Sequence, residues 1–294
     1  MATTTVPSTP SRPRTSAPVP RGRSAGSRAL RWVRGHITQA YAALALLFLF
    51  LPVAYVLLFS FNNTSSRFNE RWTGFTWTYW RHPCAVPGMC QSLKVSLQLG
   101  AIATVGATLL GTMIAFALVR HRFLGRTATN LLIFLPMATP EVVMGSSLLT
   151  LFVNQASPLP LGFWTIAIAH IMFDISFVVV TVKARLQGLD PRLEQAAMDL
   201  YATPFQTLRR VTLPLVMPGI VAAALLAFAL SFDDFIITDF NAGSVVTFPM
   251  FVYGAHQRGV PPQINVIGSL TFFLALVFTA IGQLGRGRAA RKHA

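Results

Sequence analysis

Long apolar stretches constrain this chain more than any other feature of its sequence. A helix needs about 20 apolar residues to cross roughly 30 Å of bilayer hydrocarbon. Windows of this kind cover residues 38–61, 92–119, 129–153, 163–182, 216–240 and 264–284. Only 11% of the residues are charged and 53% are hydrophobic, whereas an average soluble domain has about 25% charged residues. The sequence therefore predicts an all-α membrane protein, a bundle of six transmembrane helices.

The basic residues are distributed unevenly along the chain. Of the 24 Lys and Arg residues, 19 fall in four segments that alternate with pairs of spans, namely residues 1–35, 120–128, 183–215 and 285–294. The positive-inside rule places these segments, and with them both termini, in the cytoplasm. The formal net charge of +15 is thereby an orientation signal, and we expect no nucleic-acid partner. We expect a disordered basic tail over residues 1–35, a six-span domain over residues 36–284 and a basic tail over residues 285–294.

The segment between the first two spans, residues 62–91, is expected outside the cytoplasm. Its aromatic residues include Trp72, Phe75, Trp77, Tyr79 and Trp80. Such rings favour the membrane interface, so we expect an anchoring belt, with contact to a partner as the alternative. Cys84 and Cys90 lie in the same segment, where oxidation is possible. The sequence leaves open whether they form a disulfide.

Residues suited to enzymatic chemistry are scattered along the chain. None of the lysines, Lys94, Lys183 and Lys292, lies in a phosphate-binding loop, so any ATP hydrolysis that drives this protein belongs to another chain. Two cysteines cannot make a four-thiolate zinc site, and the six histidines are spread over both sides of the membrane. We expect no catalytic residue, no metal and no cofactor in this chain, which makes an integral membrane enzyme the weakest alternative.

The longest cytoplasmic segment between spans, residues 183–215, predicts two short helices joined at a sharp corner. Asp190 precedes Pro191 and Thr203 precedes Pro204, and each pair is a helix start signal. Each proline then stands at the first helical position, where its missing N–H leaves no hydrogen bond unmade.

The first of these two helices is amphipathic. A spacing of three or four residues defines its apolar face, which consists of Leu193, Ala196, Ala197 and Leu200. The helix is too short to span a bilayer, and anionic lipid would repel Glu194 and Asp199. We therefore expect it to dock into a groove of another protein.

The same segment carries a motif with known relatives. It runs through Gln195, Ala196, Ala197, Tyr201, Val211, Leu213 and Pro214. The arrangement resembles the Glu-Ala-Ala, Gly and Leu-Pro pattern in the cytoplasmic loop of the membrane subunits of ATP-binding-cassette importers. Two positions depart from it, because Gln195 beside Glu194 stands for the acidic residue and Tyr201 for the glycine. The resemblance implies an ATPase contact made by Glu194, Gln195, Ala196, Ala197, Asp199, Leu200, Tyr201, Leu213 and Pro214.

Further stretches are similar to the second membrane subunit of spermidine/putrescine uptake systems. They include residues 140–145, 161–164, 177–182 and 231–235. The resemblance implies a type I importer permease in the bacterial inner membrane, a second homologous permease, two ATPase subunits that bind ATP and magnesium, and an extracytoplasmic binding protein. The same architecture with another cargo, such as another organic amine, a phosphonate or ferric ion, is an alternative. An ion-coupled secondary transporter is a weaker one, because those folds often show internal repeats.

Acidic residues inside the predicted spans are Glu141, Asp174, Asp233, Asp234 and Asp239. A charge at the centre of a span costs about 2.5–3.5 kcal/mol, so each carboxylate needs a partner, a proton or water. Asp174 follows His170 by one helical turn, and we expect a structural pair. Glu141, Asp233 and Asp234 are predicted to line a path for a polycationic polyamine, or else to bond backbone groups freed at kinks. Because Asp233 and Asp234 are adjacent, at most one can point straight into such a path.

Overall fold

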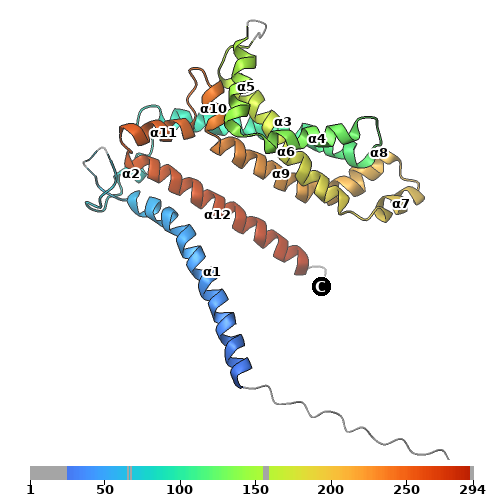
Figure 1. Cartoon of the computed structure of the whole chain (residues 1–294), viewed down its shortest axis with the longest axis horizontal. Helices are drawn as coiled ribbons and strands as arrows, with labels where there is room; N and C mark the ends of the chain where they lie inside the picture. The colour runs from blue at the N-terminus through green and yellow to red at the C-terminus, as the bar shows by residue number, and fades with distance from the viewer. Residues whose placement is uncertain (1–24, 65, 67, 155–158, 292–294) are drawn as a thin grey trace, which may run out of the picture. The chain divides into compact units, whose positions relative to one another are not determined.

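The computed structural model describes the backbone of residues 25–64, 66, 68–154 and 159–291, and their side chains from residue 35 to residue 277. The helices are α1 (Ala25–Phe59), α2 (Thr78–Arg81), α3 (Met89–Arg120), α4 (Arg126–Ala138), α5 (Glu141–Val153), α6 (Phe163–Gln187), α7 (Arg192–Asp199), α8 (Pro204–Thr207), the π-helical turn η1 (Leu208–Thr212), α9 (Leu213–Asp233), α10 (Ile236–Asn241), α11 (Phe248–Arg258) and α12 (Pro262–Arg291). Over the described residues, β pairing is limited to an isolated bridge between Asn62 and Phe75. The predicted all-α architecture is confirmed (Figure 1).

Helix α1 up to Tyr55 belongs to a separate unit of the chain and is described by itself. Its part from residue 35 to residue 59 is long and apolar enough to cross a bilayer, in agreement with the window 38–61. The backbone is helical from Ala25, well before the predicted end of the basic tail, because the proline-rich composition of that tail ends at Pro20. Residues 1–24 of the predicted tail lie outside the described residues, as do residues 292–294 beyond the end of α12.

In the described part of the remaining chain, three helical stretches are long and apolar enough to span a membrane: residues 89–120, 163–187 and 204–233. The predicted windows 92–119 and 163–182 lie inside the first two of these stretches, in α3 and α6. In α12, the apolar part within the described side chains is the shorter stretch Pro262–Val277. The number of six spans therefore stays a prediction.

The window 129–153 is not the continuous helix that a single span predicts. Helix α4 ends at Ala138, α5 begins at Glu141, and the two helices are bent by 106°. Pro140 lacks an N–H and clashes with a helical conformation of the residue before it, so Thr139 is extended, with φ −79° and ψ 132°. The segment is a broken span or a re-entrant loop.

The window 216–240 is also interrupted, at Asp234. Helix α9 ends at Asp233, and Asp234 has φ −63° and ψ 128°. The Asp234 side chain bonds the backbone of α10, an alternative to helix continuation that Asp readily offers. The predicted fifth span thus ends before Asp234, and its apolar helix starts earlier, at Pro204, inside the segment 183–215 that the sequence predicts to be a loop.

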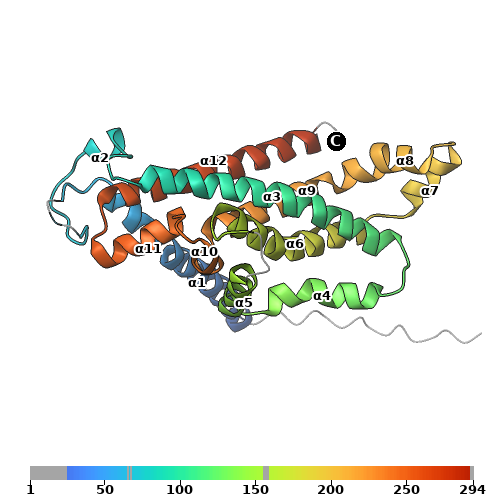
Figure 2. The same ribbon diagram turned by 90° about the horizontal axis from the view of Figure 1, so that it is seen from above.

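Helices α3, α6 and α9 pack against one another, and Figure 2 shows α3 running alongside the other two. Their shared core consists largely of small and β-branched residues, including Ala107, Ala115, Val178, Val182, Val216, Ala223 and Ala227. At Gly111 the backbone of α3 closely approaches α6, because a Cβ added there would lie 2.7 Å from Cγ1 of Val178. Small residues allow such contact between membrane helices, where close packing replaces the hydrophobic effect.

The close contact at Gly111 predicts that a single added methyl group at this position lowers the stability of the protein. Gly111→Ala should force α3 away from α6 and lower stability by about 1–3 kcal/mol, the usual cost of overpacking. Gly254→Ala in α11 is the matched control, because a Cβ at Gly254 meets nothing within 4 Å. Thermal unfolding in detergent should show a lower midpoint for the first variant only. Equal midpoints in the two variants would contradict the close helix contact.

Candidate functional site

The two predicted helix start signals form hydrogen bonds in the loop that contains α7 and α8. The Oδ1 atom of Asp190 accepts a hydrogen bond from the N–H of Arg192 at 2.9 Å. At α8, the Thr203 Oγ1 accepts from the N–H of Gln206 at 3.3 Å, and the Gln206 Oε1 accepts from the N–H of Thr203 at 3.0 Å. This reciprocal pair is a capping box. Both helix starts are therefore confirmed.

The first loop helix, α7, ends at Asp199. Tyr201 follows in the left-handed region, with φ +60°. Its N–H donates to the Met198 carbonyl at 2.9 Å, and the N–H of Ala202 donates to the Ala197 carbonyl at 3.1 Å. A turn of this kind after a helix usually holds Gly, which adopts positive φ without strain. Tyr201 keeps that conformation with a side chain that is 95% exposed.

No residue of α7 is buried. Among the expected contact residues, those with exposed side chains are Gln195, Ala196, Asp199, Leu200, Tyr201 and Pro214, while Ala197 and Leu213 are half-buried. Leu200 is 82% exposed and Phe205 of α8 is 68% exposed. We call Leu193, Leu200, Tyr201 and Phe205 the loop tip. Exposed apolar side chains that follow one another closely along a loop are typical of a surface that binds a partner.

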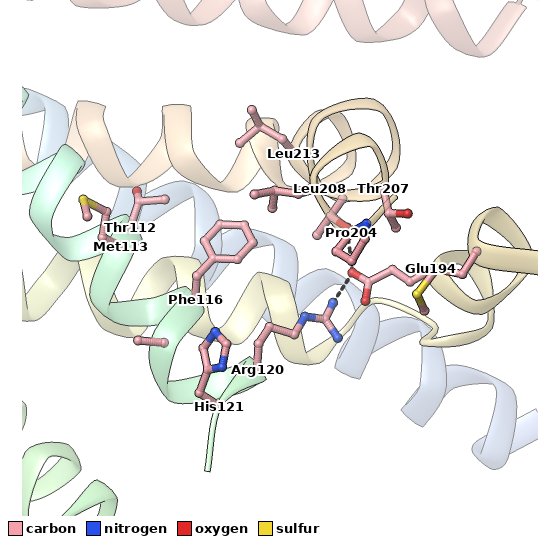
Figure 3. A pocket seen from close by; sticks show the side chains of 13 residues that line it. Thr112, Met113, Phe116, Arg120, His121, Glu194, Pro204, Thr207, Leu208 and Leu213 are labelled. Carbon is pink, nitrogen blue, oxygen red and sulfur yellow. Dashed lines mark hydrogen bonds and ion pairs between the residues drawn. The ribbon is translucent and has the colours of Figure 1, made fainter. Parts of the chain in front are cut away.

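Glu194 differs from its neighbours because it faces its own chain. It accepts hydrogen bonds from Arg120 at the end of α3 and from the Thr212 hydroxyl, the latter at 2.6 Å. Figure 3 shows the Arg120 guanidinium reaching the carboxylate. The side chains of Arg120 and Glu194 are 30% and 20% exposed. Because water screens such a pair, it adds little to the free energy of unfolding, and its main effect is to hold α7 in position.

A cavity of about 560 Å³ lies behind this ion pair (Figure 3). Its walls come from the end of α3, from α7 and from the segment α8 to α9, and include Phe116, Met198, Leu208 and Leu213. Pro214 follows, in the first turn of α9, and lacks an N–H for the helical ladder. The preceding residues form the wider π turn η1, the kind of local adjustment that inserts extra backbone into a helix.

The three acidic residues predicted to line a path lie in different environments. Glu141 is the first residue of α5 and is exposed, and Asp233 is the last residue of α9 and is exposed. The Asp234 side chain is only 8% exposed. Its Oδ2 accepts from the N–H of Thr238 at 2.8 Å, so it caps α10. Of the two adjacent aspartates, Asp233 faces open space.

The predicted pair of His170 and Asp174 is wrong. The Nε2 of His170 lies 3.3 Å from Oδ2 of Asp234 and 2.9 Å from Oγ1 of Thr238. The Oδ2 of Asp174 accepts from the Ser231 hydroxyl at 2.6 Å. The spacing of one turn does place both α6 side chains on one face, but each meets its partner across the helix interface.

In the segment between α1 and α3, Cys84 and Cys90 form a disulfide in the structure, with Cα atoms 5.5 Å apart. Phe61 stacks on Trp80 with ring centroids 5.2 Å apart and meets the edge of Trp77 at 4.9 Å. Trp72, Phe75 and Trp77 are also exposed, so either a membrane belt or a partner surface fits them. Among the described residues, no three His, Cys, Asp or Glu side chains gather as a metal site would require.

Sequence reasoning missed Arg120, Ser231 and Thr238. For Thr238 a signal existed, because an Asp four residues before a Thr is a pattern of local capping. Arg120 and Ser231 contact residues far along the chain, and nothing in their own neighbourhood indicates those partners.

The family of this helical membrane protein follows from its relatives. A family model described as "binding-protein-dependent transport system inner membrane component" matches residues 107–288. The match covers more than half of the chain, and the protein belongs to this family of transport permeases.

Among curated relatives, the spermidine/putrescine transport system permease protein PotC of Escherichia coli (strain K12) is 37% identical over 251 residues, covering 85% of this chain and 92% of the relative. The putrescine transport system permease protein PotI of the same strain is 37% identical over 244 residues, or 81% and 84% of the two chains. A bacterial alginate ABC transporter solved with an alginate-bound periplasmic protein has a chain with TM-score 0.67 and 15% identity, covering 87% of this chain and 94% of that one. That structural likeness establishes the permease fold.

The contacts of Glu194 with Arg120 and Thr212, which hold α7 in place, give a second prediction. Arg120→Met should leave Glu194 with the Thr212 hydroxyl alone and loosen α7. Amide hydrogen exchange in residues 192–202 should accelerate severalfold, while the free energy of global unfolding falls by only about 0–1 kcal/mol, as expected for an exposed ion pair. Arg122→Met, at an exposed position two residues further on, should change neither quantity. Unchanged exchange in Arg120→Met would show that the ion pair does not hold the loop.

Proposed function

We propose that this protein is one of two homologous membrane subunits of an ATP-driven importer of polyamines such as spermidine and putrescine. The observation that carries the proposal is the 37% identity with a spermidine/putrescine permease over 92% of that relative's length. The proposed complex adds a second permease, two ATPase subunits that bind ATP and magnesium, and an extracytoplasmic binding protein. Both termini and the loop 183–215 lie in the cytoplasm, since most basic residues fall in those segments.

The charges inside the apolar helices support a cationic cargo. Glu141 and Asp233 are exposed carboxylates at the two interrupted spans. Irregular backbone at membrane depth is tolerated only where it is buried in protein or lines a water-filled cavity. A polyamine that leaves bulk water gains attraction from such carboxylates, whereas a phosphonate would be repelled. We assign Glu141 and Asp233 to the path and Asp234 to the local backbone.

The loop tip supports docking to an ATPase. Its apolar side chains are exposed, Leu193 on α7, Leu200 and Tyr201 in the turn that follows it and Phe205 on α8. Glu194 faces inward, whereas Arg192 and Asp199 of α7 are exposed, so the surface offered to a protein groove combines apolar side chains with these two charges. Movement of the docked loop on ATP binding and hydrolysis would switch the path between its outward and inward openings.

A Leu200→Asp substitution tests the docking. The side chain is 82% exposed, so this change should leave the fold of the permease intact. In the docked complex it would bury an unpaired charge at a cost of several kcal/mol. The ATPase should no longer copurify with the permease, and ATP hydrolysis stimulated by the binding protein should be lost.

Leu124→Asp is the matched control, since Leu124 is fully exposed in the turn between α3 and α4. It should copurify with the ATPase as the parent does. Normal copurification and hydrolysis of Leu200→Asp would remove the loop tip from the interface.

The path is tested by neutralising its carboxylates one at a time. Glu141→Gln and Asp233→Asn should each reduce uptake of labelled polyamine at least tenfold, because about 1.4 kcal/mol suffices for that factor. The ATPase should copurify normally, and the binding protein alone should bind polyamine as before. Asp239→Asn, at another exposed carboxylate on α10, should transport at the parental rate. If both neutral variants assemble and transport normally, the two carboxylates do not contact the cargo.

A further inference from the structure

Several buried polar side chains beside Asp233 have no part in the roles described so far. His170 and Asp174 of α6 are 2% and 0% exposed. Ser231 of α9 and Thr238 of α10 are also buried. Buried polar groups inside apolar helices are costly unless they are hydrogen-bonded, so their arrangement indicates what they hold in place.

The first attachment fixes Asp234. Its carboxylate receives the Thr238 N–H at 2.8 Å and the Thr238 hydroxyl at 2.9 Å. His170 reaches the same pair from α6, with Nε2 at 2.9 Å from the Thr238 hydroxyl and 3.3 Å from the carboxylate. The Thr238 hydroxyl can therefore donate to Asp234 while it accepts from His170. This arrangement turns the Asp234 side chain toward α6 and α10.

The second attachment lies on the other side of the break. The Ser231 hydroxyl donates to Asp174 at 2.6 Å. Ser231 is three residues before Asp234, and Thr238 is four residues after it. Two side chains of α6 one turn apart, Asp174 and His170, thus form hydrogen bonds with the end of α9 and the start of α10. In the sequence, Asp233 lies between the two residues that they contact.

Helix α10 is also fastened to α5. The Asn241 side chain donates to the Gly145 carbonyl at 3.4 Å, and a Cβ on Gly145 would lie 2.7 Å from the ring of Phe240. Ile237 shares an apolar cluster with Met144 and Leu148. The break that follows α9 is therefore packed against the helix that begins with Glu141.

We propose that His170 and Thr238 are positioning residues, which hold Asp234 against α6 and α10 and thereby present Asp233 to the cargo. This inference rests on the proposed function of Asp233. Asp233 ends α9, and Asp234 leaves the helix with φ −63° and ψ 128°. The bonds from the Asp234 carboxylate to α10 and to His170 hold the backbone of this break, and with it the direction of the Cα–Cβ bond of Asp233. Without the His170 and Thr238 contacts, the Asp234 carboxylate loses partners that offset its burial. It would then turn toward water, the backbone of the break would no longer be held, and the Asp233 side chain would change direction.

The test measures where residue 233 points. In the assembled transporter with its ATPase, Asp233→Cys is labelled with a charged, membrane-impermeant thiol reagent. The native Cys84 and Cys90 form a disulfide and do not compete. Adding Thr238→Val, which keeps the side-chain shape and removes the hydroxyl, should change the labelling rate about fivefold, the factor that corresponds to one hydrogen bond. Adding Thr238→Ser, which keeps the hydroxyl, should leave the rate near the parental value.

His170 provides an independent pair of variants in case Thr238→Val does not assemble. His170→Leu should change the labelling rate at position 233 as Thr238→Val does. His170→Gln should keep the labelling rate near the parental value, because its side-chain amide can donate a hydrogen bond near the Nε2 position. Asp239→Cys serves as the labelling control and should react at one rate in every background. An unchanged labelling rate at position 233 in Thr238→Val and in His170→Leu would overturn the proposal.

Polyamine uptake distinguishes a positioning role of Thr238 from a merely structural one. Thr238→Val should lower polyamine uptake about fivefold when Asp233 is present and less than twofold when Asp233→Asn is already in place, since coupled residues are not additive. Equal losses in both backgrounds would show that Thr238 does not act through Asp233. Parental uptake by Asp233→Asn itself would refute the proposed path, and the labelling rates would still decide whether His170 and Thr238 position residue 233.

Discussion

The need to satisfy every backbone hydrogen bond without water governs this structure more than any other constraint. A bilayer offers no partner for a free N–H or C=O, so helices dominate and each interruption needs compensation. At Pro140 the chain compensates through Thr139, whose N–H and hydroxyl both donate to the Leu135 carbonyl. At Asp234 a carboxylate receives the first amides of α10. Hydrogen bonds between residues close in sequence therefore stabilise both interruptions. Each interruption has an exposed carboxylate next to it, Glu141 at the first and Asp233 at the second.

Close packing between helices is what positions these interruptions. Gly111 brings α3 against Val178 of α6, and Gly145 brings α5 against Phe240 of α10. Neither contact tolerates a larger residue without movement of a helix. The polar attachments from His170 and Asp174 then select one register for α9 and α10 on α6. Small residues allow the helices to approach closely, and the buried hydrogen bonds determine how α9 and α10 are aligned on α6.

The sequence predicted what depends on neighbours along the chain. The apolar windows in α3 and α6 and the helix starts after Asp190 and Thr203 follow from local composition and capping. Proline chemistry also predicts a kink or break at Pro136 and Pro140, and the break occurs at Pro140, whereas Pro136 stays inside α4. The interruption at Asp234 did not follow, because an aspartate in an apolar window ends a helix only according to what packs around it. The partner of His170 could not be predicted from spacing, since Thr238 is 68 residues away in the chain. Tyr201 likewise shows that a turn can keep the conformation of a glycine position when the side chain points into solvent.

Helix α9 joins the two proposed parts of the permease. It begins at Leu213, which lines the cavity behind α7, and it ends at Asp233. Its 21 residues extend over about 32 Å at 1.5 Å per residue. The π turn η1 adjoins its first residue, while Ser231 fastens its last turn to α6. A displacement of the loop would therefore reach the more adaptable turn first and then α9, which contains Pro218 in its interior. In the proposed importer, the hydrogen bonds around Asp234 determine whether Asp233 moves together with α9 or stays fixed while α9 moves.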